Sequence, residues 1–355
     1  MIKILLLIDY SSEFDRKLLR GLVQYSKENG PWLFYRLPSY YSAMHGEQGI
    51  LKWAKEWKAD AIIGQWNNDT IDLQKELNIP VVLQNYHHRS VTYSNLTGDY
   101  KGTGRMAAQF FAKRMFRNFA YFGVKGVVWS DERCEGYRQE VKRIGGEFFS
   151  FESDKKEEEI RMEVSQWLQQ LPKPVALFCC DDAHALFISE TCRMNNIHIP
   201  EEIALLGVDN DELMCNISDP PISSIELEVE RGGYSIGRLI HQQIKKEHGG
   251  TFNIVINPIR IELRQSTEKH NIKDPYVLEV VKYIDSHYSS DLTIESLLAN
   301  IPLSRRNFEV KFKHAMNTSI YQYILNCRVD HLADLLLTTN RPLADIATDA
   351  GFKDY

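Results

Sequence analysis

The 355-residue chain lacks several features that would assign it to a particular class of protein. No stretch approaches the roughly 20 apolar residues of a membrane-spanning helix. The N-terminal apolar run Ile4–Ile8 is too short for the core of a signal peptide, and Asp9 ends it with no small-residue cleavage site after it. We therefore expect no membrane partner, and we disfavour an exported protein.

Cysteine is also scarce, with six residues in the chain, none of them in a C-x-x-C pair. No histidine cluster supplies zinc spacing, so we expect neither a metal nor another cofactor. Cys179 and Cys180 lie in the apolar run Val175–Cys180, which is typical of a buried strand. Small buried thiols fit a reducing compartment, and this favours a cytoplasmic protein.

An excess of positive charge is missing as well, since the formal net charge is −6. A protein that coats nucleic acid would be basic, so any DNA binding must come from a local patch. The chain is 43% hydrophobic and 25% charged, which is typical of a folded globular protein. At roughly 150 residues per domain, the length predicts two to three domains.

Apolar runs alternate with amphipathic helical patterns over residues 1–265. The candidate strands, rich in Val, Ile, Leu and Phe, are Ile2–Ile8, Leu33–Leu37, Ala61–Gly64, Val81–Gln84, Phe119–Gly123, Gly146–Phe149, Val175–Cys180 and Ala204–Val208. The helices between them include Asp15–Lys27, with Asp15 as its N-cap, Gly104–Met115 and Glu157–Leu171. Strands that read as buried on both faces predict an α/β fold with two parallel sheets.

A late strand, Ile254–Glu262, is followed by a polar segment that ends in Pro275, and we expect the domain linker there, over residues 266–275. Every later pattern is helical, which predicts an all-α domain over 276–355. The expected helices are Tyr276–Tyr288, Thr293–Asn300, Ser304–Met316, Thr318–Leu337 and Pro342–Ala350.

Two of these helices form a helix-turn-helix pattern, because Pro302 cannot continue the first and Ser304 can cap the second. Phe308 and Phe312, four residues apart, would face the core. The candidate DNA-binding residues on the same helix are Arg305, Arg306, Asn307, Glu309, Val310, Lys311 and Lys313. Their excess of positive charge suits phosphates, although an ordinary solvated helix face would look similar.

The C-terminal segments Leu303–Phe308, Ile346-Ala347 and Gly351-Phe352 resemble the AraC/XylS-type DNA-binding domain, which joins two helix-turn-helix units by a long helix. The resemblance implies that Arg306, Glu309 and Val310 face bases in the major groove. Leu332 departs from the family, which usually has Ala there. The second recognition helix would start near Tyr355, so we expect the second unit to be incomplete.

The first 265 residues carry polar groups at predicted strand ends, among them Asp9, Asp99, Arg133 and Asp209. Such groups can bind sugar hydroxyls, while an aromatic ring such as that of Trp66 covers the C–H face of a sugar. Each Asp alone could equally be an N-cap or turn residue.

Residues 1–265 also resemble the LacI/GalR-type effector domain, the two-lobed type I periplasmic-binding-protein fold. The segments that carry this resemblance are 97–104, 133–137, 180–182, 207–210, 220–225 and 264–267. It implies lobe 1 over about 1–116 and 225–251, and lobe 2 over about 117–224 and 252–265. It also implies that Asp99, Arg133 and Asp209 bind sugar, with Cys180 where the lactose-type repressor has a sugar-binding Asn.

An effector domain of this kind followed, rather than preceded, by an AraC-type domain resembles the pentose-responsive regulators of sugar-use genes. That resemblance implies a homodimer on double-stranded DNA and a transcription activator, with D-xylose as effector and L-arabinose as the alternative. A nicotinamide-type α/β enzyme is the rival interpretation, because Gly102–Ala107 matches the dinucleotide pattern G-x-G-x-x-A. No other catalytic pattern supports an enzyme.

Overall fold

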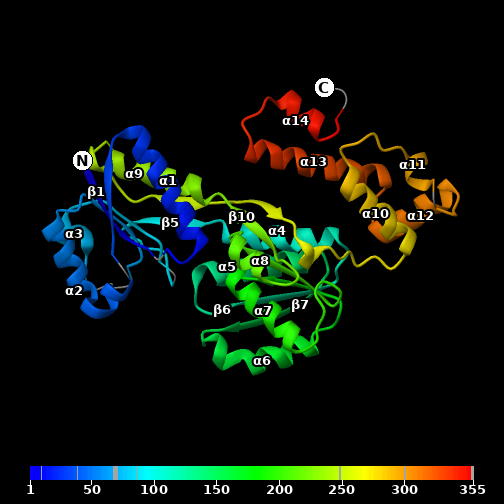
Figure 1. Ribbon diagram of the computed structural model, residues 1–355, viewed down its shortest axis with the longest axis horizontal. Helices are drawn as coiled ribbons and strands as arrows, with labels where there is room; N and C mark the ends of the chain where they lie inside the picture. The colour runs from blue at the N-terminus through cyan, green and yellow to red at the C-terminus, as the bar shows by residue number, and fades with distance from the viewer. Residues whose placement is uncertain are drawn as a thin grey trace. The chain divides into compact units, whose positions relative to one another are not determined.

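The computed structural model describes residues 1–355 except 9, 38, 67–70, 86, 248, 300 and 353–355. The chain forms two compact units, one of residues 1–109 and 118–268 and the other of residues 110–117 and 269–355 (Figure 1). Within the described residues, no helix has both the length and the apolar character needed to cross a membrane.

The first unit contains two six-stranded sheets, as the two-lobed α/β prediction requires. Sheet A has the order β11-β5-β4-β3-β1-β2 and is parallel throughout. Its strands are β1 (Ile2–Leu7), β2 (Trp32–Arg36), β3 (Ala61–Gly64), β4 (Val81–Leu83), β5 (Ser94–Gly98) and β11 (Asn253–Ile256). We call this sheet and its helices the first lobe.

Sheet B, the centre of the second lobe, has the order β12-β10-β9-β8-β6-β7 and is parallel except for β12. Its strands are β6 (Asn118–Val124), β7 (Glu147–Ser153), β8 (Val175–Cys179), β9 (Ile203–Val208), β10 (Ser223–Leu227) and β12 (Pro258–Glu262). The helices of the first unit are α1 (Glu13–Asn29), α2 (Ser39–Trp57), α3 (Leu73–Leu77), α4 (Tyr100–Lys113), α5 (Val128–Arg143), α6 (Glu157–Gln170), α7 (Asp182–Met194), α8 (Glu212–Ile217) and α9 (Val229–Ile244).

Three details differ from the sequence-based expectations. The expected late strand is two strands in different sheets, β11 and β12, so the chain changes lobe at Asn257. The expected lobe boundaries are also a few residues off. Residues 225–227 were expected in lobe 1 but belong to β10 of sheet B, and residues 253–256 were expected in lobe 2 but form β11 of sheet A. The rest of both ranges agrees, since α9 packs on α1 in the first lobe and β12 lies in the second. The N-cap of α1 is Ser12, whose Oγ accepts from the Asp15 amide at 3.1 Å, so the prediction of Asp15 as the cap is wrong.

Strands β5 and β10 have no counterpart among the predicted strands because their buried residues are partly polar. Ser94, Asn95 and Thr97 of β5 are buried, as are Ser223 and Ser224 of β10. Hydrogen bonds satisfy these groups; the Ser223 Oγ, for example, donates to the Arg264 carbonyl oxygen at 2.9 Å. A search for apolar runs cannot detect such strands.

The helical unit contains α10 (Pro275–His287), α11 (Ile294–Leu298), α12 (Arg305–Met316), α13 (Ile320–Thr338) and α14 (Leu343–Asp349). Side chains cap the first four of these helices; Asp274 caps α10, Thr293 caps α11, Ser304 caps α12 and Ser319 caps α13. Phe308 and Phe312 are fully buried in the core of this unit, as their spacing predicts.

Two glycines let α4 and α5 pack at backbone contact distance. A Cβ on Gly104 would lie 2.1 Å from the Arg133 carbonyl oxygen and 2.6 Å from the Tyr137 amide nitrogen. A Cβ on Gly136 would lie 2.1 Å from the Lys101 carbonyl oxygen. The backbones of α4 and α5 are therefore in direct contact, with no side chain between them at these two positions.

We predict that Gly104→Ala destabilises the chain by about 1–3 kcal/mol, because the added methyl must push α4 and α5 apart. Chemical denaturation measures the free energy of unfolding. Gly249→Ala is the matched control, since a Cβ there meets nothing within 4 Å. Equal stabilities of the two variants would contradict the close packing described above.

Candidate functional site

A buried arginine organises the candidate ligand site. Arg133, on α5, is 3% exposed, and its Nη1 donates to the Cys180 carbonyl oxygen at the end of β8. Its Nη2 lies 3.8 Å from the Asp209 carboxylate. The rings of Tyr100 and Trp129 lie 5.5 Å and 5.4 Å from the guanidinium, within cation–π range. Among the described residues, its Nε has no hydrogen-bond partner.

Asp209 follows β9 and is held in an unusual backbone conformation, with a φ of 99°. Burial raises the pKa of its carboxyl group to about 6, although the Arg133 charge lowers it. Asp181 adds to the rise, and Lys17 opposes it. A carboxyl group with this pKa can exchange a proton near neutral pH, and it can accept from or donate to a hydroxyl group.

Two further acidic residues, Asp181 and Asp182, follow β8. Asp182 is 2% exposed and accepts from the Ser224 Oγ at 2.6 Å and from the Asp211 amide at 2.8 Å. Burial, with the nearby Asp209 charge, raises the pKa of Asp182 well above its usual range. Asp181 caps α7 and also lies 2.7 Å from the His184 Nδ1. Asp182 is thus largely occupied by structural contacts, whereas Asp209 faces Arg133.

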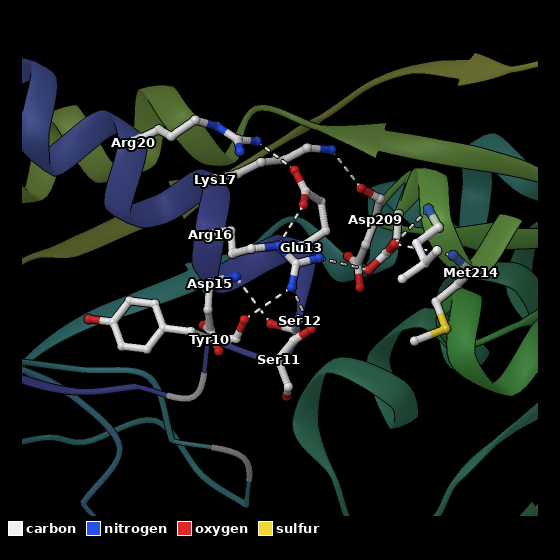
Figure 2. Close-up of polar contacts among 12 residues, drawn as sticks. Tyr10, Ser11, Ser12, Glu13, Asp15, Arg16, Lys17, Arg20, Asp209 and Met214 are labelled. Carbon is white, nitrogen blue, oxygen red and sulfur yellow. Dashed lines mark hydrogen bonds and ion pairs between the residues drawn. The ribbon is translucent and has the colours of Figure 1, made fainter. Parts of the chain in front are cut away.

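The N-terminal end of α1, in the first lobe, reaches the loop after β9 in the second lobe. The Lys17 Nζ donates to the carbonyl oxygens of Asp209 at 2.8 Å and Asn210 at 3.3 Å. The preceding residue, Arg16, has its Nη2 3.4 Å from the Asp211 carboxylate. Figure 2 shows both cations extending from α1 toward this loop.

A second ion pair also bridges the two lobes. Arg89, which precedes β5, forms a two-pronged ion pair with Glu132 of α5, at 2.6 Å and 2.8 Å. Its Nε also donates to the Thr97 Oγ1 at 2.8 Å. Bidentate pairs of this kind fix direction as well as distance. The two bridges hold the lobes together around Arg133.

The structure brings together three of the six predicted sugar-site residues, namely Arg133, Asp209 and the main chain of Cys180. The Cys180 thiol is fully buried and cannot face a ligand. Asp99 follows β5 and accepts from the Gly102 amide at 2.8 Å, so its carboxylate serves the start of α4. Asp9 lies outside the described residues.

Trp66 is 4% exposed and packs in the core of the first lobe. Its Nε1 has no hydrogen-bond partner in the described part of the chain, and the same is true of the buried Gln84 Oε1. Trp66 follows β3 and Gln84 follows β4, and because these strands are parallel neighbours, both residues lie at the same sheet edge.

The sequence-based prediction missed Lys17, Tyr100, Asp181 and Asp182. The two aspartates could have been found by the rule that selected Asp209, because they directly follow a predicted strand. Lys17 carries no such signal, since it lies within a helix and acts across the lobes.

The glycines behind the rival nucleotide-binding interpretation have a packing role. The matching segment starts inside α4, and a Cβ on Gly102 would lie 1.9 Å from the Asp99 Oδ2. A dinucleotide fingerprint instead forms the turn between a strand and its helix. Gly102 and Gly104 are therefore explained by the helix start and by the contact with α5.

On α12, the predicted DNA-binding residues are exposed or half-buried, but they differ in their partners. Arg305 pairs with Glu295 at 2.7 Å and with Glu309 at 3.0 Å, and Lys311 pairs with Asp274. The face that carries Arg306, Asn307, Val310 and Lys313 is exposed, and the described residues form no ion pair with Arg306 or Lys313. These two cations are available for phosphates.

The beginning of a second helix-turn-helix unit is also visible. The short helix α14 ends at Asp349, and Gly351 follows in the left-handed conformation with a φ of 88°. The Gly351 amide donates to the Thr348 carbonyl oxygen at 2.9 Å, which closes the last turn. Any recognition helix after this turn would lie outside the described residues.

Comparison with known proteins matches both parts of the chain. A model of a periplasmic binding protein-like domain matches residues 108–267, and a model of a helix-turn-helix domain matches residues 297–355. These matches and the observed sheets support the predicted fold class.

Full-length relatives have the same order of parts. The chain is 23% identical to the xylose operon regulatory protein of Escherichia coli (strain K12), over 99% of this chain and 91% of that protein. It is 24% identical to the xylose operon regulatory protein of Haemophilus influenzae, over 99% and 92%. A solved structure of the xylose-binding transcription activator xylR has a TM-score of 0.64 at 22% identity, over 99% of this chain and 91% of that chain.

We predict that Asp209→Asn stabilises the chain at pH 7 by on the order of 2 kcal/mol, because the ionised carboxylate is costly in the folded state. The folded chain binds the proton more tightly than the unfolded chain does. The stability that this proton contributes is therefore present below about pH 4 and is lost as the pH rises through about 6.

Urea denaturation of both proteins between pH 4 and 7 measures this effect. The stability difference is expected to shrink toward zero as the pH falls to about 4. An Asp209→Asn variant that is less stable than the parent at pH 7 would show that the ion pair with Arg133 outweighs the cost of burial.

Proposed function

We propose that this chain, which joins a periplasmic binding protein-like domain to a helix-turn-helix domain as the xylose operon regulatory proteins do, is a sugar-responsive DNA-binding regulator of transcription. The observation that carries the proposal is the buried Arg133 beside Asp209, held between two bridged lobes. No reaction is required of these residues, and the relatives are regulators rather than enzymes.

The effector that we infer is a pentose, with D-xylose as the first candidate and L-arabinose as the second. The relatives named above support D-xylose. The site supplies what a sugar requires, namely a charged donor in Arg133, an acid in Asp209 and the rings of Tyr100 and Trp129. Charged and amphipathic groups of this kind bind hydroxyl groups and cover C–H faces.

The sugar would act through the bridges between the lobes. A ligand shifts a conformational equilibrium only by contacts that differ between the two states. Arg133 and Asp209 belong to the second lobe, whereas Lys17 and Arg89 reach them or their neighbours from the first. A sugar that contacts both lobes would stabilise the joined arrangement.

On the DNA side, we infer that α12 enters the major groove, as the second helix of a helix-turn-helix does. Arg306 and Lys313 would contact phosphates, while Asn307 and Val310 would face bases. Arg305, Glu309 and Lys311 would then orient the helix through their ion pairs. We further infer that the chain acts as a homodimeric activator in the cytoplasm.

The sensor proposal predicts that D-xylose raises the melting temperature of the protein, since a ligand at 100 times its Kd adds about 2.7 kcal/mol of stability. A thermal-shift panel of pentoses and hexoses gives the selectivity. Arg133→Met should abolish the shift, whereas Arg138→Met, on the same helix but half-exposed, should retain it. If no sugar in the panel stabilises the parent protein, the sensor proposal is wrong.

The DNA-binding proposal predicts that Arg306→Ala and Lys313→Ala each weaken binding to a mixed-sequence duplex and reduce the salt slope of log K by about 1. Lys282→Ala, an exposed cation on α10, is the matched control. Fluorescence anisotropy at several salt concentrations measures both quantities. Unchanged slopes in both α12 variants would place the DNA elsewhere.

A further inference from the structure

The loop that carries Asp209 has a strained backbone. Asp209 and Asn210, which follow β9, have φ values of 99° and 49°, in the left-handed region that few residues other than glycine adopt. Such residues persist only where the surrounding structure fixes them. The contacts that hold residues 209–211, which we call the Asp209 loop, therefore decide where the Asp209 carboxylate lies.

The backbone amides of this loop donate to fixed acceptors in the second lobe. The Asn210 amide donates to the Ser224 Oγ, on β10, at 3.0 Å. The Asp211 amide donates to the carboxylate of Asp182, the first residue of α7, at 2.8 Å. The Ser224 Oγ donates to the same carboxylate at 2.6 Å, so the two acceptors also hold each other. The loop backbone is therefore attached both to β10 and to the start of α7.

The carboxyl group of Asp182 fits its place because residue 207 of β9 is a glycine. A Cβ on Gly207 would lie 2.1 Å from the Asp182 Oδ1, so a side chain there would displace this group. Asp182 is 2% exposed, and its two oxygens accept from Ser224 and from the Asp211 amide. Asp182 therefore supports the Asp209 loop from within the lobe rather than contacting a ligand itself.

The side chain of Asn210 is held separately, by Arg264. The Arg264 Nη2 donates to the Asn210 Oδ1 at 2.8 Å, and its Nη1 donates to the Ile222 carbonyl oxygen at 3.0 Å. A guanidinium group is planar and its donors have fixed directions, so two contacts of this kind fix its orientation. Arg264 thus links the Asn210 side chain to the main chain just before β10.

The backbone of Arg264 is fixed as well as its side chain. Its amide donates to the Ser223 Oγ at 2.7 Å, and its carbonyl oxygen accepts from the same Oγ at 2.9 Å. Arg264 is half-buried and follows β12, the antiparallel strand at the edge of sheet B. Because Arg264 is anchored to β10 at both its main chain and its side chain, it can hold the Asp209 loop rather than follow it.

These contacts leave the Asp209 carboxylate to Arg133. Arg264 binds the side chain of Asn210, while the Lys17 Nζ, from the first lobe, binds the carbonyl oxygens of Asp209 and Asn210. The Asp209 carboxylate lies 3.8 Å from the Arg133 Nη2. The loop is thus held by its main chain and by Asn210, and its acidic side chain is directed to the candidate ligand site.

We propose that Arg264 is a positioning residue of the ligand site, which holds Asn210 and so keeps the Asp209 carboxylate beside Arg133. Arg264 does not contact the sugar; it fixes the loop conformation in which Asp209 binds one. This inference rests on the proposed function, because it needs a sugar at Arg133 and Asp209.

The first test is the Kd for D-xylose, measured for the full chain by isothermal titration calorimetry. Arg264→Met and Asn210→Ala remove the same contact, so each should raise the Kd at least about fivefold, and the double variant should bind no more weakly than the weaker single variant. Arg260→Met is the matched control, because Arg260, on β12, pairs with Glu226 and Glu262 of sheet B. Its Kd should stay within about twofold of the parent value.

Two results of this titration would overturn the proposal. The first is a Kd within about twofold of the parent value in both Arg264→Met and Asn210→Ala. The second is a double variant in which the two losses of affinity add, because Arg264 would then act other than through Asn210.

A second measurement follows the Asp209 loop without any sugar. In the parent, burial raises the pKa of the Asp209 carboxyl group to about 6. The charged and titratable groups that face it are Arg133, Lys17, Asp181, Asp182 and Asp211. Carbon NMR of aspartate-labelled protein gives this pKa, and Asp209→Asn identifies the signal. A loop released by Arg264→Met or Asn210→Ala should expose the carboxyl group to water and lower its pKa toward the ordinary value of about 4.

Arg260→Met should leave the Asp209 titration unchanged. An unchanged titration in both Arg264→Met and Asn210→Ala would overturn the proposal, because the loop would then keep its place without Arg264. If the parent binds no sugar while the Asp209 titration shifts as expected, the sensor proposal fails and the positioning of Asp209 by Arg264 is supported. The two failures can therefore be told apart.

Discussion

The burial of one positive charge determines the arrangement of the first unit's candidate site. Arg133 is almost completely removed from water, which is unfavourable unless polar groups replace its hydration. The Cys180 carbonyl oxygen, the Asp209 carboxylate and two aromatic rings do so only in part. The helix that carries Arg133 is fixed in turn by the close packing of Gly104 and Gly136 between α4 and α5. The unsatisfied Nε is the property expected of a group that awaits a ligand acceptor.

Three carboxyl groups lie near the single positive charge of Arg133, and their negative charges repel one another. Asp181, Asp182 and Asp209 lie close enough to affect one another's ionisation, and Lys17 directs its donors to carbonyl oxygens rather than to carboxylates. The pKa of Asp209 therefore rises. Such sites are less stable than an apolar replacement would be, and proteins retain them where binding requires them. The candidate site also lies beside the contacts between the two lobes. A ligand bound there could form hydrogen bonds with the buried charged groups and so offset the cost of their burial.

Strands and helices that follow from apolar patterns and caps could be predicted from the sequence. Features that depend on buried polar residues or on contacts between distant segments could not. The buried runs of β1, β3, β8 and β9, and the helix order of the second unit, could be predicted because hydrophobic periodicity is local. Strands β5 and β10 could not, since Ser94 or Ser223 suits a strand only when distant partners satisfy it. In the site, Arg133 and Asp209 were predicted, whereas Lys17 acts across lobes and Cys180 presents its carbonyl oxygen instead of its thiol. The hydrogen bond from the Asn271 Nδ2 to the Met115 carbonyl oxygen joins positions 156 residues apart, beyond the reach of any local pattern.

The charge of the helical unit sets a limit on how a single copy can bind DNA. Arg305 and Lys311 are engaged by Glu295, Glu309 and Asp274, which leaves Arg306 and Lys313 as the cations of α12 available to phosphates. Two phosphate contacts give weak, strongly salt-dependent binding. Two linked copies multiply such affinities only when their geometry allows both to engage at once. In the homodimer proposed above, the weakness of each contact would therefore increase sensitivity, because a small change in the spacing of the two helix-turn-helix domains would decide whether the pair binds.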